Sequence, residues 1–228
     1  MHDAYNHCNG GIVKQYVAIN RGVNMRKVAE QLLKESERRY RLVRTMNNQV
    51  KRYETMNQIV SHYITMTFVT TGNRAGADRI IQIGAIKYED GKQVAQFNSL
   101  INPKRFVPLK VTRETGIANA FVENAPTIER KIDEFLAFID GYPIVTTGAA
   151  TQMAFFYALE RQLQEQLPSI KVMDLHKMIR KALPFIRGEE MEQLNTLLME
   201  EQQAKHALER CEKYHDLYEL YVKIRPYM

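Results

Sequence analysis

From residue 64 onward the sequence changes to short β-forming runs separated by turn residues, and this change constrains the fold more than any other feature of the chain. Residues 64–70, 79–88 and 93–101 are each rich in β-branched and aromatic side chains. The sequence Glu-Asp-Gly-Lys at 89–92 separates the second run from the third and is typical of a hairpin turn. The three runs therefore predict an antiparallel meander.

After this meander, helical and strand patterns alternate towards the C-terminus. Residues 128–139 place apolar side chains at helical spacing, and residues 142–147 have the pattern of a short buried strand. A second helix, a second strand at 170–174 and further helices to residue 225 follow. A meander followed by alternating helices and strands predicts a mixed sheet with flanking helices, so the predicted fold class is α/β.

The composition is that of an ordinary globular protein. Of the 228 residues, 45% are apolar and 25% are charged, which excludes collagen-like and largely disordered chains. The apolar runs are far shorter than the roughly 18 residues that a membrane span needs, and the first residues lack the pattern of a secretory signal. Only two cysteines are present, which indicates the reducing cytoplasm rather than a disulfide framework.

The net charge of the chain lies in one N-terminal segment. Residues 21–55 contain ten Lys and Arg against four Glu, and the difference equals the whole net charge of +6. Such a segment predicts attraction to polyanions; a solvated helix face with a basic bias is the alternative. For bound nucleic acid, the predicted phosphate contacts are Arg38, Arg39, Arg41, Arg44, Lys51 and Arg52.

Residues 23–64 contain neither proline nor glycine and predict one long basic helix, preceded by an N-terminal arm or short strand at 1–22. A helix of this length spans about 60 Å and overhangs a small domain. Apolar residues at alternating steps of three and four predict a coiled-coil seam formed by Val43, Met46, Val50, Tyr53, Val60 and Ile64. The seam predicts a homodimer or a protein partner, and packing of the helix on its own domain is the alternative.

The order of short motifs in the rest of the chain resembles one family. The motifs are FVTTG at 68–72, the strand-rich stretch at 78–103, VTRETGI at 111–117, NAP at 124–126, YPIVTTGAATQMAFF at 142–156 and HALERC at 206–211. In this order they resemble the DnaQ-like (DEDDh-type) 3'–5' exonuclease family of the RNase H-like superfamily. The resemblance implies the mixed-sheet exonuclease fold for a domain at 65–228.

The resemblance also implies where the catalytic residues lie, and the acidic ones are missing. The family holds two Mg²⁺ or Mn²⁺ ions with four carboxylates and uses a histidine as general base. The matching positions are occupied by Thr67, Val69, Gln152, Cys211 and His206, and only the histidine agrees with the family. Four neutral side chains do not balance a formal charge of about +4 from two divalent ions. The sequence therefore predicts no bound metal, no other cofactor and no cleavage.

The motif Thr70-Thr71-Gly72 agrees with the family and predicts a turn that a terminal nucleotide can approach closely, because glycine has no Cβ. A turn retained only for the fold is the alternative. Together these features predict a catalytically inactive exonuclease-like protein, a pseudoenzyme that acts by binding, with a protein partner ranked slightly ahead of nucleic acid. The alternative is an active metal-dependent 3'–5' exonuclease, similar to the DNA polymerase III epsilon subunit but with non-standard ligands.

Overall fold

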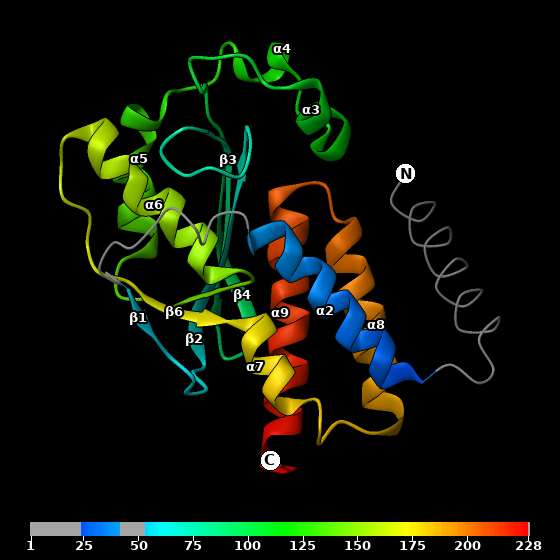
Figure 1. The fold of residues 1–228 in the computed structure, drawn as a ribbon. Helices are drawn as coiled ribbons and strands as arrows, with labels where there is room; N and C mark the ends of the chain where they lie inside the picture. Colours follow the sequence, from blue (N-terminus) through cyan, green and yellow to red (C-terminus); the bar gives the residue numbers. More distant parts are fainter. Residues whose placement is uncertain (1–23, 42–52, 228) are drawn as a thin grey trace, which may run out of the picture.

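A mixed β-sheet forms the centre of the computed structural model, which describes residues 24–41 and 53–227 (Figure 1). In this part of the chain the strands lie in the order β1-β6-β5-β2-β3-β4. Their bounds are Glu54–Thr55 (β1), His62–Thr70 (β2), Ile80–Glu89 (β3), Lys92–Leu100 (β4), Ile144–Thr146 (β5) and Lys171–Asp174 (β6). β2, β3 and β4 pair antiparallel, and β1, β6, β5 and β2 run parallel. The predicted meander and the α/β class are confirmed.

Helices cover both faces of the sheet (Figure 1). On one face, α5 (Ile128–Ile139) and α6 (Ala149–Leu163) enclose a hydrophobic core with the strands. The core of the other face is built by α2 (Met25–Arg41), α7 (Leu175–Ala182), α8 (Gly188–Gln203) and α9 (Ala207–Ile224). The short helices α3 (Leu109–Thr115) and α4 (Asn119–Val122) pack against the end of β2 and the start of β3, and a 3₁₀ turn at Arg225–Tyr227 follows α9.

The amphipathic pattern of α5 explains the position of this helix on the sheet. Its buried residues recur at helical spacing: Ile128, Ile132, Phe135 and Ile139. The ring of Phe135 lies 5.9 Å from that of Phe68 in β2 and 5.4 Å from that of Phe97 in β4, measured between centroids. Contacts between aromatic rings at these separations stabilise the packing of the helix on the sheet.

The prediction of one helix over residues 23–64 is wrong. α2 ends at Arg41, residues 42–52 lie outside the described part, and the chain from Tyr53 to Ile64 forms β1, a connection and the start of β2. Tyr53 packs against the core around α5 and α6, Val60 packs against the opposite core, and Ile64 is fully buried in β2. The backbone of Val60 also exchanges two hydrogen bonds with the Tyr218 hydroxyl, at 2.8 and 2.9 Å.

Three residues of the predicted coiled-coil seam, Tyr53, Val60 and Ile64, therefore belong to the domain itself. The other three, Val43, Met46 and Val50, lie outside the described residues. The physical reason for the error is that long-range contacts outweigh the moderate helix propensity of residues 53–64: the exposed strand β1 pairs with β6, and Tyr63 and Ile64 are buried in β2.

α2 packs against its own domain. This arrangement was the alternative to an overhanging helix. Ala29 and Leu33 are fully buried against the core of α7, α8 and α9. Asn195 Nδ2 of α8 donates a hydrogen bond to the Met25 carbonyl at 3.1 Å, and Gln202 Nε2 donates to the Leu32 carbonyl at 3.0 Å. These contacts fix the N-terminal half of α2 on α8, so this part of the basic segment belongs to the body of the protein.

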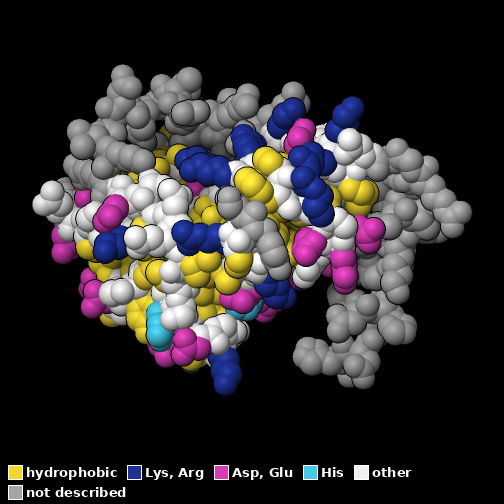
Figure 2. Space-filling view, turned by 90° about the horizontal axis from the view of Figure 1, so that it is seen from below, with side chains coloured by type: hydrophobic (Ala, Val, Ile, Leu, Met, Phe, Trp, Pro, Cys, Tyr) yellow, Lys and Arg dark blue, Asp and Glu magenta, His cyan; other side chains and the backbone are white. Residues whose placement is uncertain are grey.

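The predicted phosphate contacts are only partly placed. Arg38, Arg39 and Arg41 lie in α2, whereas Arg44, Lys51 and Arg52 lie outside the described residues. On the face seen in Figure 2, basic side chains alternate with hydrophobic and acidic ones. Among the described helices, none is both long and apolar enough to cross a membrane.

Candidate functional site

The structure brings Thr67 and Gln152 together at the point where β2 separates from β5. β5 pairs with β2 only at Ile64 and Thr65, so the N–H group of Phe68 has no partner strand on that side. The Gln152 side chain, near the start of α6, accepts this N–H at 2.9 Å and donates its own N–H to Thr67 Oγ1 at 3.3 Å. Both side chains are buried. The amide of Gln152 thus fills the space beside β2 with a neutral group whose hydrogen bonds are satisfied.

Cys211 approaches the same strand from α9. The Cys211 side chain is fully buried and donates a hydrogen bond to the Gly84 carbonyl at 3.3 Å. Burial raises the pKa of the thiol, so the group is protonated and neutral at physiological pH. A neutral thiol is a poor ligand for Mg²⁺, which prefers oxygen donors.

α9 comes this close to the sheet because position 84 is glycine. A Cβ built on Gly84 would lie 2.5 Å from the Ala207 Cβ and 2.8 Å from the Ala207 carbonyl carbon. Ala207 N donates a hydrogen bond to Gln82 Oε1 at 3.3 Å, which fixes the first turn of the helix on β3. Gly84 therefore sets how deeply Cys211 enters the site.

Val69 supplies no ligand atom. The side chain is 3% exposed and packs in a hydrophobic cluster with Ile81, Val107, Val111 and Ile117, where α3 meets the sheet. A carboxylate at this position would meet apolar side chains rather than cations. The cluster explains the residue as part of the core.

His206 is the family position at the N-terminus of α9. It is the exposed residue that precedes α9, and its N–H and that of Lys205 donate to the Glu209 carboxylate at 3.5 and 3.0 Å. Within the described residues, its side chain makes no hydrogen bond with Thr67, Gln152 or Cys211. His206 therefore has a structural position at a helix start, and no bound water or ion is needed to explain it.

The residues at these positions do not fit a pair of divalent ions. Across residues 24–41 and 53–227, no three His, Cys, Asp or Glu side chains are grouped so that they could hold a metal. Thr67, Gln152 and Cys211 carry no charge, and Val69 has no donor atom. Hard cations need several carboxylate oxygens to replace their hydration shell.

The polar groups of the Thr70–Gly72 turn form hydrogen bonds within their own loop. Thr70 Oγ1 donates to the Gly72 carbonyl at 2.7 Å, and Thr71 exchanges two hydrogen bonds with the backbone of Arg79. A Cβ on Gly72 would lie 2.6 Å from an Asp78 carboxylate oxygen, so a side chain here would displace the carboxylate that accepts the Arg74 N–H. These contacts favour the interpretation that the fold requires the turn.

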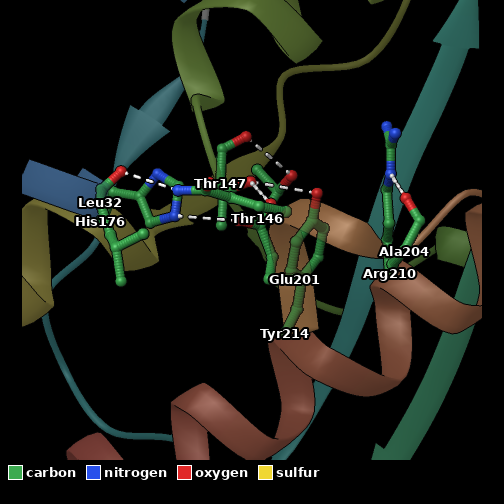
Figure 3. Close-up of polar contacts among 9 residues, drawn as sticks. Leu32, Thr146, Thr147, His176, Glu201, Ala204, Arg210 and Tyr214 are labelled. Carbon is green, nitrogen blue, oxygen red and sulfur yellow. Dashed lines mark hydrogen bonds and ion pairs between the residues drawn. The ribbon is translucent and has the colours of Figure 1, made fainter. Parts of the chain in front are cut away.

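A buried polar network behind the site escaped the sequence-based predictions (Figure 3). Thr147 Oγ1, after β5, donates to the Tyr214 hydroxyl at 3.0 Å and lies 3.5 Å from Glu201 Oε1. Glu201 Oε2 lies 3.8 Å from His176 Nε2. Burial, and secondarily the charge of Arg180, lowers the pKa of His176 to about 3, so the imidazole is neutral at pH 7.

Asp174 is a buried acidic residue at the end of β6, the strand beside β5. Its contacts explain how a carboxylate can lie there. Its carboxylate accepts from the Ala149 N–H at 3.2 Å and lies 3.4 Å from Lys177 Nζ. Burial raises its pKa despite the charge of Lys177. The available sequence signal for Asp174 and for the network was the presence of polar residues within otherwise apolar strand and helix patterns. This signal was not sufficient, because the partners of these residues are far away in the sequence.

The comparison with protein families agrees with the fold. The model of the RNase T-type exonuclease family matches residues 70–208, which is more than half of the chain. The chain therefore belongs to the exonuclease family, in the DnaQ-like group.

Several characterised proteins are similar in sequence. The chain is 31% identical over 143 residues to DNA polymerase III subunit epsilon of Treponema pallidum, covering 63% of this chain and 66% of the relative. It is 32% identical over 138 residues to the 3'-5' exonuclease DinG of Bacillus subtilis, covering 60% and 14%. A PolC-type DNA polymerase III of Clostridium perfringens is 32% identical over 120 residues, covering 52% and 8%. The chain thus spans less than two thirds of the length of these relatives.

Solved structures share the fold at low sequence identity. Escherichia coli Exonuclease I in complex with a dT13 oligonucleotide matches with a TM-score of 0.61 at 11% identity, over 73% of this chain and 42% of that chain. The nuclease domain of 3'hExo, a DEDDh family member bound to rAMP, matches with a TM-score of 0.53 at 12% identity, over 75% and 94%. These likenesses establish the fold and nothing beyond it.

Proposed function

We propose that this chain is a catalytically inactive member of the exonuclease family that binds nucleic acid without cutting it. The observation that carries the proposal is that Thr67, Val69, Gln152 and Cys211 are all buried and uncharged, and are held by hydrogen bonds or apolar contacts within the domain. Without bound divalent ions the family's reaction lacks both its activated water and the stabilisation of its leaving oxygen.

Charge favours nucleic acid over a protein partner. The segment at residues 21–55 carries a charge equal to the whole net charge of +6. Three of the six residues of the predicted seam, Tyr53, Val60 and Ile64, pack within the domain, which removes half of the support for a helix seam. A basic segment of this kind supplies affinity without sequence preference. The two cysteines favour a role in the cytoplasm.

An active exonuclease is the second candidate. Relatives such as the epsilon subunit of Treponema pallidum and DinG of Bacillus subtilis favour it, because their names describe a polymerase subunit and a 3'-5' exonuclease. Retention of His206, the one family residue present, favours it as well. This candidate requires a metal-binding arrangement other than the one that the described residues form.

The binding role is tested by fluorescence anisotropy of a 5'-labelled single-stranded oligonucleotide with the full chain, in Mn²⁺ and in a chelator. We expect equal affinity in both buffers and a steep decrease in affinity with salt. Replacing Arg38, Arg39 and Arg41 by Gln is expected to reduce the salt slope by about three, whereas the same loss of charge at Lys171, Lys181 and Lys223 leaves it unchanged. Absence of binding, or equal loss in both triple variants, would contradict the proposal.

A further inference from the structure

A pocket with a basic lining lies beside the loop that follows β2. It has a volume of about 470 Å³ and is lined by Arg79, Pro103, Lys104, Arg105, Glu129 and Gln162. We call it the basic pocket. These residues come from the start of β3, the segment after β4, the first turn of α5 and the end of α6. None of the family's catalytic positions lines it. Its volume is within the range of about 300–1,000 Å³ that small-molecule sites occupy.

The charges in the basic pocket do not cancel. Three cationic side chains face one acid, Glu129, whose carboxylate lies 3.5 Å from Lys104 Nζ and accepts from Gln162 Nε2 at 3.0 Å. Partial burial opposes ionisation of Glu129, but hydrogen bonds from Thr127 and Gln162, and then the charge of Lys104, lower its pKa to about 2. Glu129 is therefore ionised at physiological pH, and the lining keeps two positive charges in excess.

Both arginines are held in place by the loop that contains residues 76–78. Arg79 Nη1 donates to the carbonyls of Gly76, Ala77 and Asp78 at 3.1, 3.4 and 3.2 Å. Arg105 Nη1 donates to the same Ala77 carbonyl. Each guanidinium has five N–H donors, and these bonds use one terminal nitrogen of each. The remaining donors are pre-oriented for an anion, because the side chains are already ordered.

Lys104 has an unusual backbone conformation for a lysine. Its φ is +52°, in the left-handed region, and its N–H donates to Asn102 Oδ1 at 2.8 Å. Residues other than glycine in this region cost free energy and are concentrated at ligand-binding sites. Asparagine adopts this conformation more readily than lysine, so the backbone alone does not explain a lysine here. The charged side chain of Lys104 lines the basic pocket.

We propose that the basic pocket binds the phosphate group of a nucleotide, either free or as part of a polynucleotide strand. Two excess positive charges match a phosphate monoester, and the arginine fork matches the geometry of its oxygens. The volume also admits the sugar or base attached to the phosphate. This inference goes beyond the proposed function and holds whether or not the chain cleaves nucleic acid.

The test is calorimetric titration of the full chain with three probes: pyrophosphate, adenosine monophosphate and a short single-stranded oligonucleotide. In the double variant Lys104→Asn and Arg105→Gln, we expect at least about tenfold weaker binding of every probe that the unmodified protein binds, because two charged donors are lost. The matched control, Lys181→Gln with Lys223→Gln on α7 and α9, removes the same charge from exposed positions outside the pocket and is expected to bind normally.

A second variant is expected to bind the probes more tightly. Because damage to the fold weakens binding, tighter binding would not be explained by such damage. Glu129→Gln removes the repulsion between its carboxylate and a bound anion, and we expect severalfold tighter binding. Binding of adenosine monophosphate that the Lys104→Asn, Arg105→Gln variant loses identifies a free nucleotide, and binding of the oligonucleotide alone that this variant weakens identifies a strand; oligonucleotide binding that the variant leaves unchanged belongs to the basic segment and overturns the inference. Binding of pyrophosphate without the oligonucleotide supports the pocket while contradicting the proposed nucleic-acid function. Absence of binding by all three probes at millimolar concentration, or equal losses in both double variants, overturns the inference.

Discussion

At the scale of single residues, Gln152 is a buried neutral side chain at a position where the resemblance to the family predicts an acid. Its amide oxygen accepts the N–H of Phe68, and its amide nitrogen donates to Thr67. A carboxylate has acceptors only, so it could not make both contacts in the same way. The amide therefore stabilises the site without a metal.

Replacing Gln152 by Leu is expected to lower the free energy of unfolding by about 2–3 kcal/mol, because it leaves the Phe68 N–H and the Thr67 hydroxyl buried without these partners. Chemical denaturation of both proteins measures the difference. The matched control is Gln193→Leu on the exposed face of α8, where we expect a change within about 0.5 kcal/mol. Equal effects in the two variants would show that the Gln152 contacts contribute little.

At the scale of elements, the polar network of Figure 3 joins parts of the fold that are distant in sequence. Thr147 follows β5, His176 lies in α7, Glu201 in α8 and Tyr214 in α9. A buried network of this kind is sensitive to protonation, because the interior disfavours charge. Its pH dependence therefore reports how these helices are held together.

We expect stability to fall as the pH is lowered from about 6.5 towards 3. The pKa of His176 is about 3 in the folded protein and near 6.5 in the unfolded chain, so between these values the unfolded state binds more protons. The contribution is at most about 1.4 kcal/mol for each pH unit. Urea unfolding at pH 7.5 and pH 5 measures it, with His176→Gln as the comparison. An equal loss of stability in the variant would assign the effect to other groups, among them Glu201 beside the ring.

At the scale of the whole molecule, the sequence allowed the sheet and its helices to be predicted but not the course of the chain before β2. The meander follows from β-forming runs separated by turn residues, and α5 follows from a pattern with period 3.6; these local signals were sufficient. Residues 53–64 fit a helical pattern equally well, and only pairing with β6 and burial beside β3 decide their conformation. Long-range partners of this kind are not visible in a local window.

The difference between local patterns and long-range contacts applies to the site as well. The order of the motifs alone led to the prediction that Thr67, Val69, Gln152 and Cys211 stand where the family has acids. The contacts that these side chains make, such as that of Cys211 with Gly84, join residues far apart in the sequence. The basic pocket likewise depends on topology, because Arg79, Lys104 and Gln162 come from separate elements.

The central claim is that this exonuclease fold does not cleave nucleic acid, and one measurement tests it most directly. A 5'-labelled single-stranded oligonucleotide is incubated with the full chain in Mn²⁺ and in a chelator, and its length is followed over time. We expect the strand to stay at full length in both conditions, because no carboxylates occupy the metal-binding positions. Shortening from the 3' end that the chelator prevents would contradict the claim and identify an active exonuclease.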